Sequence, residues 1–151
     1  MRAFIKVVQD IGLLVARVAL GLVLVGHGWH RFQTGMGASA DKLALYGLPQ
    51  PQLFAWGATV LEVLGGALLV FGLLTPVVAA AVVAEQVVLI AWVKWHNGLW
   101  LATDGVEYPV ILAVLALVLV VFGSGRTGVD ALFRRGKKPS DSTSVYDRDP
   151  A

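Results

Sequence analysis

Four long apolar runs, separated by shorter polar connections, dominate the pattern of the chain. A run of about 17–25 mainly apolar residues is long enough to cross the hydrocarbon layer of a membrane as an α-helix. The pattern therefore predicts an all-α integral membrane protein, folded as an up-and-down bundle of four transmembrane helices. We expect these helices at residues 11–29, 53–74, 76–95 and 107–123.

The connections between the runs predict how the helices follow one another. Thr75 and Pro76 suit the N-cap and the first turn of a helix, so the second and third helices should meet at a tight hairpin as antiparallel neighbours. The connection 30–51 is much longer. Residues 38–46 within it are predicted to form a short helix at the membrane interface, with Ser39 as its N-cap.

The bundle is expected to occupy residues 1–133 as a single domain. Residues 134–151 are rich in Ser, Asp and Pro, which predicts a disordered tail. The basic start and the first apolar run resemble a secretion signal. However, Arg17 interrupts the apolar region, and the small-residue motif at 38–40 lies far beyond its end. The first run is therefore predicted to remain as a transmembrane helix.

Composition narrows the class of protein. Of the 151 residues, 57% are hydrophobic, whereas soluble domains contain about 45–50% by a similar count. The absence of cysteine excludes a thiol–disulfide relay, a thiolate metal site and covalent attachment of a c-type haem. The net charge of +2 does not indicate nucleic-acid binding, because most basic residues lie near the two ends of the chain.

The basic residues are distributed unequally between the two sides of the predicted bundle. The side of the long connection holds three, Arg31, Lys42 and Lys94. The side of the termini holds eight: Arg2, Lys6, Arg126, Arg134, Arg135, Lys137, Lys138 and Arg148. By the positive-inside rule both termini should be cytoplasmic. The cluster 134–138 either serves this topology alone or also contacts anionic lipid.

All five tryptophans fall toward the outer side of the predicted bundle: Trp29, Trp56, Trp92, Trp95 and Trp100. An aromatic belt at the membrane interface accounts for some of them, but belts normally occur at both interfaces. The asymmetry leaves two interpretations open, an interfacial belt and an aromatic vestibule.

Three ionisable residues, Arg17, Glu62 and Glu85, lie within the first three apolar runs. A charge in the hydrocarbon costs at least about 2.5 kcal/mol, so such residues normally face the interior of a bundle. Depths estimated at about 1.5 Å per residue allow Arg17 to pair with either glutamate or with both. A structural interpretation is a buried pair that fixes helix register. A functional one is a polar pocket or proton path.

A second group of polar residues is predicted near the outer interface: His27, His30, Lys94, His96, Asp104 and Glu107. Histidine at such a place can move protons to a quinone or to water. The histidine spacings do not match those of metal ligands, so no metal site is predicted. The chain also contains no flavin or dinucleotide fingerprint.

At several of these positions the chain resembles the DoxX family of small four-helix bacterial membrane proteins. The resemblance covers roughly residues 8–133, and the family often has lysine where Arg31 stands. It rests on Arg17 with Gly21, His27-Gly28 followed by Arg31, Glu62 with Gly65-Gly66, the turn 72–75, and the segments 96–98, 105–109 and 123–126 with Asp130.

This resemblance implies a redox role in a bacterial inner membrane. Some members are the membrane subunit of a thiosulfate:quinone oxidoreductase. Similar proteins in actinobacteria are linked to a membrane-associated oxidoreductase complex with superoxide dismutase and a sulfurtransferase. We therefore expect a membrane subunit of a quinone-linked redox complex, associated with oxidative or thiol stress defence. Two other hypotheses stay open, a non-catalytic scaffold for soluble redox enzymes and a carrier of protons or small solutes.

The candidate site residues follow from these arguments. Candidates for proton transfer or catalysis are Arg17, Glu62, Glu85, His27 and His96. The candidate quinone pocket consists of Arg17, Glu62, Trp92, His96, Glu107 and Tyr108. Electrons would have to come from a partner protein, because the chain has no redox-cofactor motif of its own.

Overall fold

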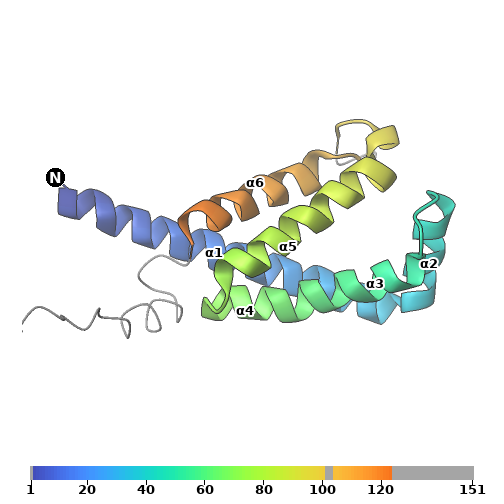
Figure 1. Cartoon of the computed structure of the whole chain (residues 1–151), viewed down its shortest axis with the longest axis horizontal. Coiled ribbons are helices and arrows are strands. Elements are labelled where there is room, and N and C mark those ends of the chain that lie inside the picture. The colour runs from blue at the N-terminus through green and yellow to red at the C-terminus, as the bar shows by residue number, and fades with distance from the viewer. Residues whose placement is uncertain (1, 101–103, 124–151) are drawn as a thin grey trace, which may run out of the picture.

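The computed structural model describes residues 2–100 and 104–123, and this part of the chain is helical with short turns and contains no strand (Figure 1). The predicted tail 134–151, the basic cluster 134–138 and the closing motif beyond Gly123 lie outside the described residues. The first helix, α1 (Arg2–Thr34), has 33 residues and exceeds the expected bounds of 11–29 at both ends.

The remaining elements join into three further rods and one short helix. Figure 1 shows α5 and α6 side by side, with α1 behind them and α2 upright at one end. The bounds are α2 (Met36–Leu45), α3 (Pro51–Val60), η1 (Leu61–Gly65), α4 (Gly66–Phe71), α5 (Thr75–Val88), η2 (Leu89–Lys94), η3 (Trp95–Asn97) and α6 (Glu107–Phe122). Here η1 and η2 are π-helical and η3 is a 3₁₀ turn, so α3–η1–α4 and α5–η2–η3 each continue without a break.

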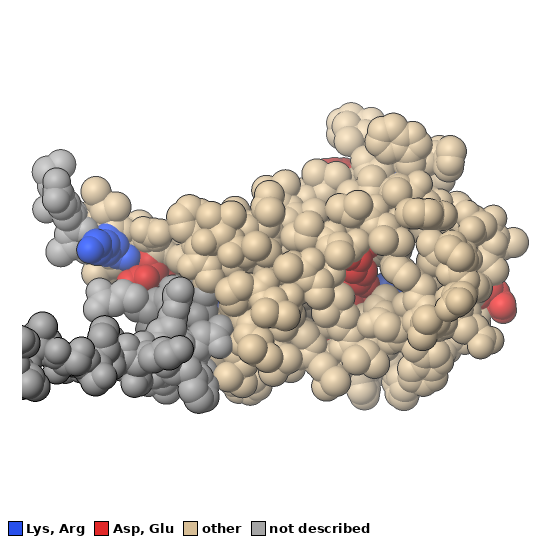
Figure 2. All heavy atoms as spheres, viewed as in Figure 1, with Lys and Arg blue, Asp and Glu red and all other residues tan. Residues whose placement is uncertain are grey.

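Three of these rods are long and apolar enough to cross a membrane. They cover Phe4–Thr34, Pro51–Phe71 and Thr75–Asn97, with 31, 21 and 23 residues. The apolar helix α6 is shorter, with 16 residues. Many large apolar side chains face outward, and Figure 2 shows a surface that is mostly uncharged. An apolar exterior on helices of this length indicates a membrane protein.

The short helix in the long connection begins earlier than predicted. Gly35, at φ 101°, occupies the N-cap of α2 and its carbonyl accepts a hydrogen bond from the Ser39 backbone N–H at 3.3 Å. Glycine adopts this backbone conformation without a steric penalty. Ser39 therefore lies inside the helix, and its prediction as the N-cap was wrong.

Glycines set the register between α1 and the second rod. A Cβ on Gly21 would lie 2.6 Å from the Gly66 carbonyl oxygen, and one on Gly28 would lie 2.8 Å from the Glu62 Cβ. Small residues allow this close approach of two backbones. Gly21 thus faces Gly66 while Gly28 faces Glu62, as expected for antiparallel helices.

Two hydrophobic clusters hold the rods together. The first lies between α1, α4, α5 and α6 and includes Leu20, Leu24, Leu69, Val82 and Leu119. The second joins α2 to α3 and η2 through Ala40, Leu43, Ala55 and Val93 together with Leu48. The second cluster anchors α2 over one end of the bundle, and the polar site lies beneath it.

Candidate functional site

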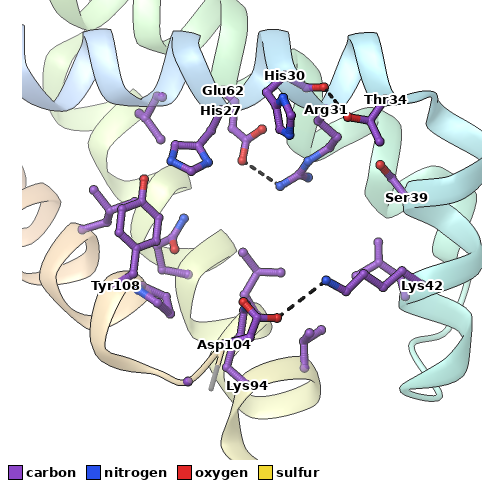
Figure 3. A pocket seen from close by; sticks show the side chains of 18 residues that line it. His27, His30, Arg31, Thr34, Ser39, Lys42, Glu62, Lys94, Asp104 and Tyr108 are labelled. Carbon is purple, nitrogen blue, oxygen red and sulfur yellow. Dashed lines mark hydrogen bonds and ion pairs between the residues drawn. The ribbon is translucent and has the colours of Figure 1, made fainter. Parts of the chain in front are cut away.

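A cavity of about 610 Å³ opens between α1, α2, the α5–η2 rod and the start of α6. Figure 3 shows polar side chains from all of these elements facing it. Its polar lining comprises His27, His30, Arg31, Thr34, Ser39, Lys42, Glu62, Gln86, Lys94, Asp104 and Tyr108. Leucines and valines from α1, α2 and η2 complete the wall, so the cavity combines an apolar surface with several charged groups.

An ion pair between Arg31 and Glu62 forms one wall of this cavity. The Arg31 Nη2 atom donates to Glu62 Oε1 at 2.8 Å, and the Glu62 side chain is only 5% exposed. Glu62 projects from the π-helical segment η1, and π-helical turns are frequent at functional sites. Because the bond is charge-assisted and mostly shielded from water, it holds the carboxylate in one orientation.

Arg17 does not occupy the position that the sequence suggested. It is buried, yet it lies eleven residues before Gly28 on α1, which is about 16 Å along the helix axis. Since Gly28 is the residue that faces Glu62, Arg17 is on the level of the α4–α5 hairpin. The sequence left open whether Arg17 pairs with Glu62, Glu85 or both. Arg17 is not among the residues that line the cavity, and the guanidinium bonded to Glu62 Oε1 is that of Arg31.

Another wall of the cavity is formed by His27 and Tyr108. Their ring centroids are 5.0 Å apart with the planes tilted by 38°, and Figure 3 shows Tyr108 pointing toward His27. The Tyr108 hydroxyl is buried and has no hydrogen-bond partner among the described residues, and the same holds for Glu62 Oε2. Buried polar atoms of this kind are normally satisfied by water or a ligand.

A cluster of opposite charges closes the cavity on the side away from Glu62 (Figure 3). Asp104 accepts a hydrogen bond from Lys94 of η2, and Lys42 of α2 lies 3.6 Å from its other oxygen. The hydrogen bond from Lys94 is the largest effect on the pKa of Asp104. Burial opposes it, and the charges of Lys94 and Lys42 add to it, so the pKa lies below its usual range. Asp104 thus links α2, η2 and the segment that leads into α6.

The structure brings together only part of the predicted site. His27, Glu62 and Tyr108 line the cavity, while Trp92, His96 and Glu107 are not among its lining residues. Glu85 is buried and lines a separate groove. All five tryptophans are between 45% and 70% exposed and none lines the cavity, which agrees better with an interfacial belt than with a vestibule.

Several lining residues were not predicted from the sequence. Thr34, Lys42 and Gln86 carry no motif, and only the fold of α2 over the bundle brings Lys42 to the cavity. Arg31 did have a signal, because it shares a helical stripe with Gly21, Leu24 and Gly28. Among the described residues, no three His, Asp or Glu side chains are grouped so that they could hold a metal ion.

The fold and the site together define a small helical membrane protein with a polar cavity near one end of its bundle. The sequence profile of the DoxX family matches residues 12–95, which is more than half of the chain. The chain therefore belongs to the DoxX family.

A similar protein of Bacillus subtilis (strain 168) is named "Putative oxidoreductase CatD". The two are 29% identical over 129 residues, which cover 85% of this chain and 92% of that protein. No solved structure matches the chain.

Proposed function

We propose that the protein is the membrane subunit of a quinone-linked redox complex, and that the polar cavity takes the quinone head group. The observation that carries this proposal is the Arg31–Glu62 pair with its unused oxygen, Glu62 Oε2, beside the unused Tyr108 hydroxyl. The cavity of about 610 Å³ is large enough for a substituted ring. Its apolar walls suit the ring faces, and its polar groups suit the two ring oxygens.

Reduction of a quinone to a quinol takes up two electrons and two protons. Arg31 would stabilise negative charge that develops on one ring oxygen, and Tyr108 would donate a hydrogen bond to the other. His27, in contact with the Tyr108 ring, and Glu62 are suited to exchange protons with water in the cavity. The electrons would come from a partner protein, which the resemblance suggests is a soluble redox enzyme such as a superoxide dismutase or sulfurtransferase complex.

The proposed topology has four membrane-spanning helices and both termini in the cytoplasm of a bacterial cell. It rests on the positive-inside rule, with eight basic residues on the side of the termini and three on the other. In this orientation the polar cavity faces the outer side of the inner membrane. A role in oxidative or thiol stress defence is part of the same proposal and is supported by the family resemblance.

The test is extraction of the purified protein with organic solvent and quantification of co-purifying quinone by mass spectrometry. We expect near-stoichiometric quinone in the natural protein and at least about a tenfold loss in Glu62→Gln, since one charge-assisted hydrogen bond contributes about 1.5–3 kcal/mol. Asp41→Asn is a matched control, because it removes an exposed carboxylate that does not line the cavity. A folded preparation without quinone would contradict the proposal and favour the scaffold hypothesis.

A further inference from the structure

A second concave site is lined by residues that do not line the polar cavity. It is a groove of about 540 Å³ between one face of α3, the turn that precedes it and α5. Figure 2 shows a hollow in this region, between α5 and the α3–η1–α4 rod, with acidic atoms at its base. The lining residues are Pro49, Gln50, Leu53, Phe54, Gly57, Ala58, Leu61 and Glu85. Apart from Gln50 and Glu85 they are apolar or glycine.

Glu85 is the unusual member of this lining. The residue is only 6% exposed, and neither of its carboxyl oxygens has a hydrogen-bond partner among the described residues. A carboxyl group accepts hydrogen bonds in both of its protonation states, so this site holds unused acceptors. Burial of such a group without a partner costs about 1–3 kcal/mol, and a ligand that donates a hydrogen bond would recover this cost.

The surroundings of Glu85 favour a neutral ligand. Glu62 pairs with Arg31, and both of these charges act on Glu85, the Glu62 carboxylate more strongly than the Arg31 guanidinium. A neutral hydroxyl group can donate a hydrogen bond to Glu85 without bringing a further charge into this buried position. Apart from Gln50 and Glu85 the lining is apolar or glycine, so a ligand that fills the groove must also carry an apolar body.

We propose that this groove is a second binding site, which takes a neutral, membrane-dissolved molecule whose hydroxyl group donates a hydrogen bond to Glu85. Two sources fit this chemistry, a hydroquinone and a lipid alcohol such as a diacylglycerol. The site differs from the polar cavity in its lining residues, and it does not depend on the proposed redox function. Gln50 at its edge offers an additional amide for the same head group.

The experiment measures dissociation constants by native mass spectrometry of the full chain in detergent. Four probes are used: dioctanoylglycerol and its O-methyl ether, and a decyl-substituted hydroquinone and its di-O-methyl ether, so that neither ether keeps a hydroxyl group. We expect the natural protein to bind at least one hydroxyl probe about tenfold more tightly than its ether, because tenfold in affinity corresponds to 1.4 kcal/mol, about one hydrogen bond. Preference for one hydroxyl probe then identifies the source of the ligand.

Two variants test the groove itself. Glu85→Leu should abolish the difference between hydroxyl and ether probes. Gly57→Leu should weaken the binding of both hydroxyl and ether probes. A Cβ on Gly57 meets no atom within 4 Å, so the added side chain fills the groove without strain. Gly26→Leu is the matched control, since it makes the same exchange at an equally open position outside both sites and should bind normally.

The outcomes separate this proposal from the quinone function of the polar cavity. Equal binding of hydroxyl and ether probes, or affinities that stay within twofold in both Glu85→Leu and Gly57→Leu, would overturn it. If Glu62→Gln loses co-purifying quinone while groove binding remains, both proposals are supported at separate places. If Glu62→Gln keeps its quinone and Gly57→Leu no longer binds the hydroxyl probes, only the proposal of a binding site in the groove is supported.

Discussion

Gly28 and Glu62 occupy the same level of the bundle, and the missing side chain of the one makes room for the other. A Cβ on Gly28 would lie 2.8 Å from the Glu62 Cβ and 2.7 Å from a methyl carbon of Val63. The close contact places Glu62 within reach of Arg31, which lies three residues further along α1. The geometry of the candidate site thus depends on a glycine that is not among the residues lining the cavity.

Gly28→Val should therefore separate α1 from η1 and weaken the ion pair. Overpacking of this kind typically costs about 1–3 kcal/mol. We expect a lower unfolding temperature in detergent and a loss of any co-purifying quinone. Gly26→Val is the control, because that position is open and should show little change. Equal effects of the two substitutions would contradict the proposed contact.

The partner of Glu62 can be identified by a double-mutant cycle. Arg31→Gln and Glu62→Gln should each destabilise the protein, but the double variant should lose less than the sum, with a coupling free energy of about 0.5–3 kcal/mol. The same cycle with Arg17→Gln and Glu62→Gln should be additive within about 0.5 kcal/mol, since those residues are far apart. The free energy of unfolding in detergent is the measurement, and coupling to Arg17 instead would refute the observed pairing.

Arg31→Lys tests what the guanidinium contributes beyond its charge. Lysine keeps the charge but has a single donor group on a flexible stem, so its hydrogen bond to a carboxylate is less well oriented. We expect a loss of stability smaller than in Arg31→Gln, together with partial retention of quinone. A loss as large as in Arg31→Gln would show that the planar fork itself is essential.

The pH dependence of stability should report the link between Asp104 and its two lysines. Its pKa is lowered in the folded protein, so its contribution is present above the unfolded pKa of about 3.9 and is lost as the pH falls through the lower folded value. Because Asp104 is half exposed, the contribution is about 0.2–1 kcal/mol. The unfolding temperature of Asp104→Asn should therefore be lower than that of the natural protein at neutral pH. In strong acid the two temperatures should converge.

The helices could be predicted from the sequence because they depend on long apolar runs, which need no knowledge of tertiary contacts. The cavity was predicted only in part. Its polar residues on α1 and α6 were found from their position at the helix ends, whereas Lys42 enters through the folding of α2 across the bundle. Arg17 was grouped with Glu62 because depths estimated from apolar runs do not show which residues of two helices face each other, and it is Gly28, eleven residues after Arg17, that faces Glu62.

The orientation of the bundle can be tested by single cysteines, since the natural chain has none. Phe4→Cys lies at the start of α1 and Leu45→Cys at the end of α2, and both positions are exposed at 73% and 87%. If the termini are cytoplasmic, a membrane-impermeant maleimide should label residue 45 in cells whose outer barrier has been opened, and residue 4 only after the inner membrane is broken. The reverse pattern would place the polar cavity on the cytoplasmic side. It would then direct the search for the electron-donating partner to the cytoplasm.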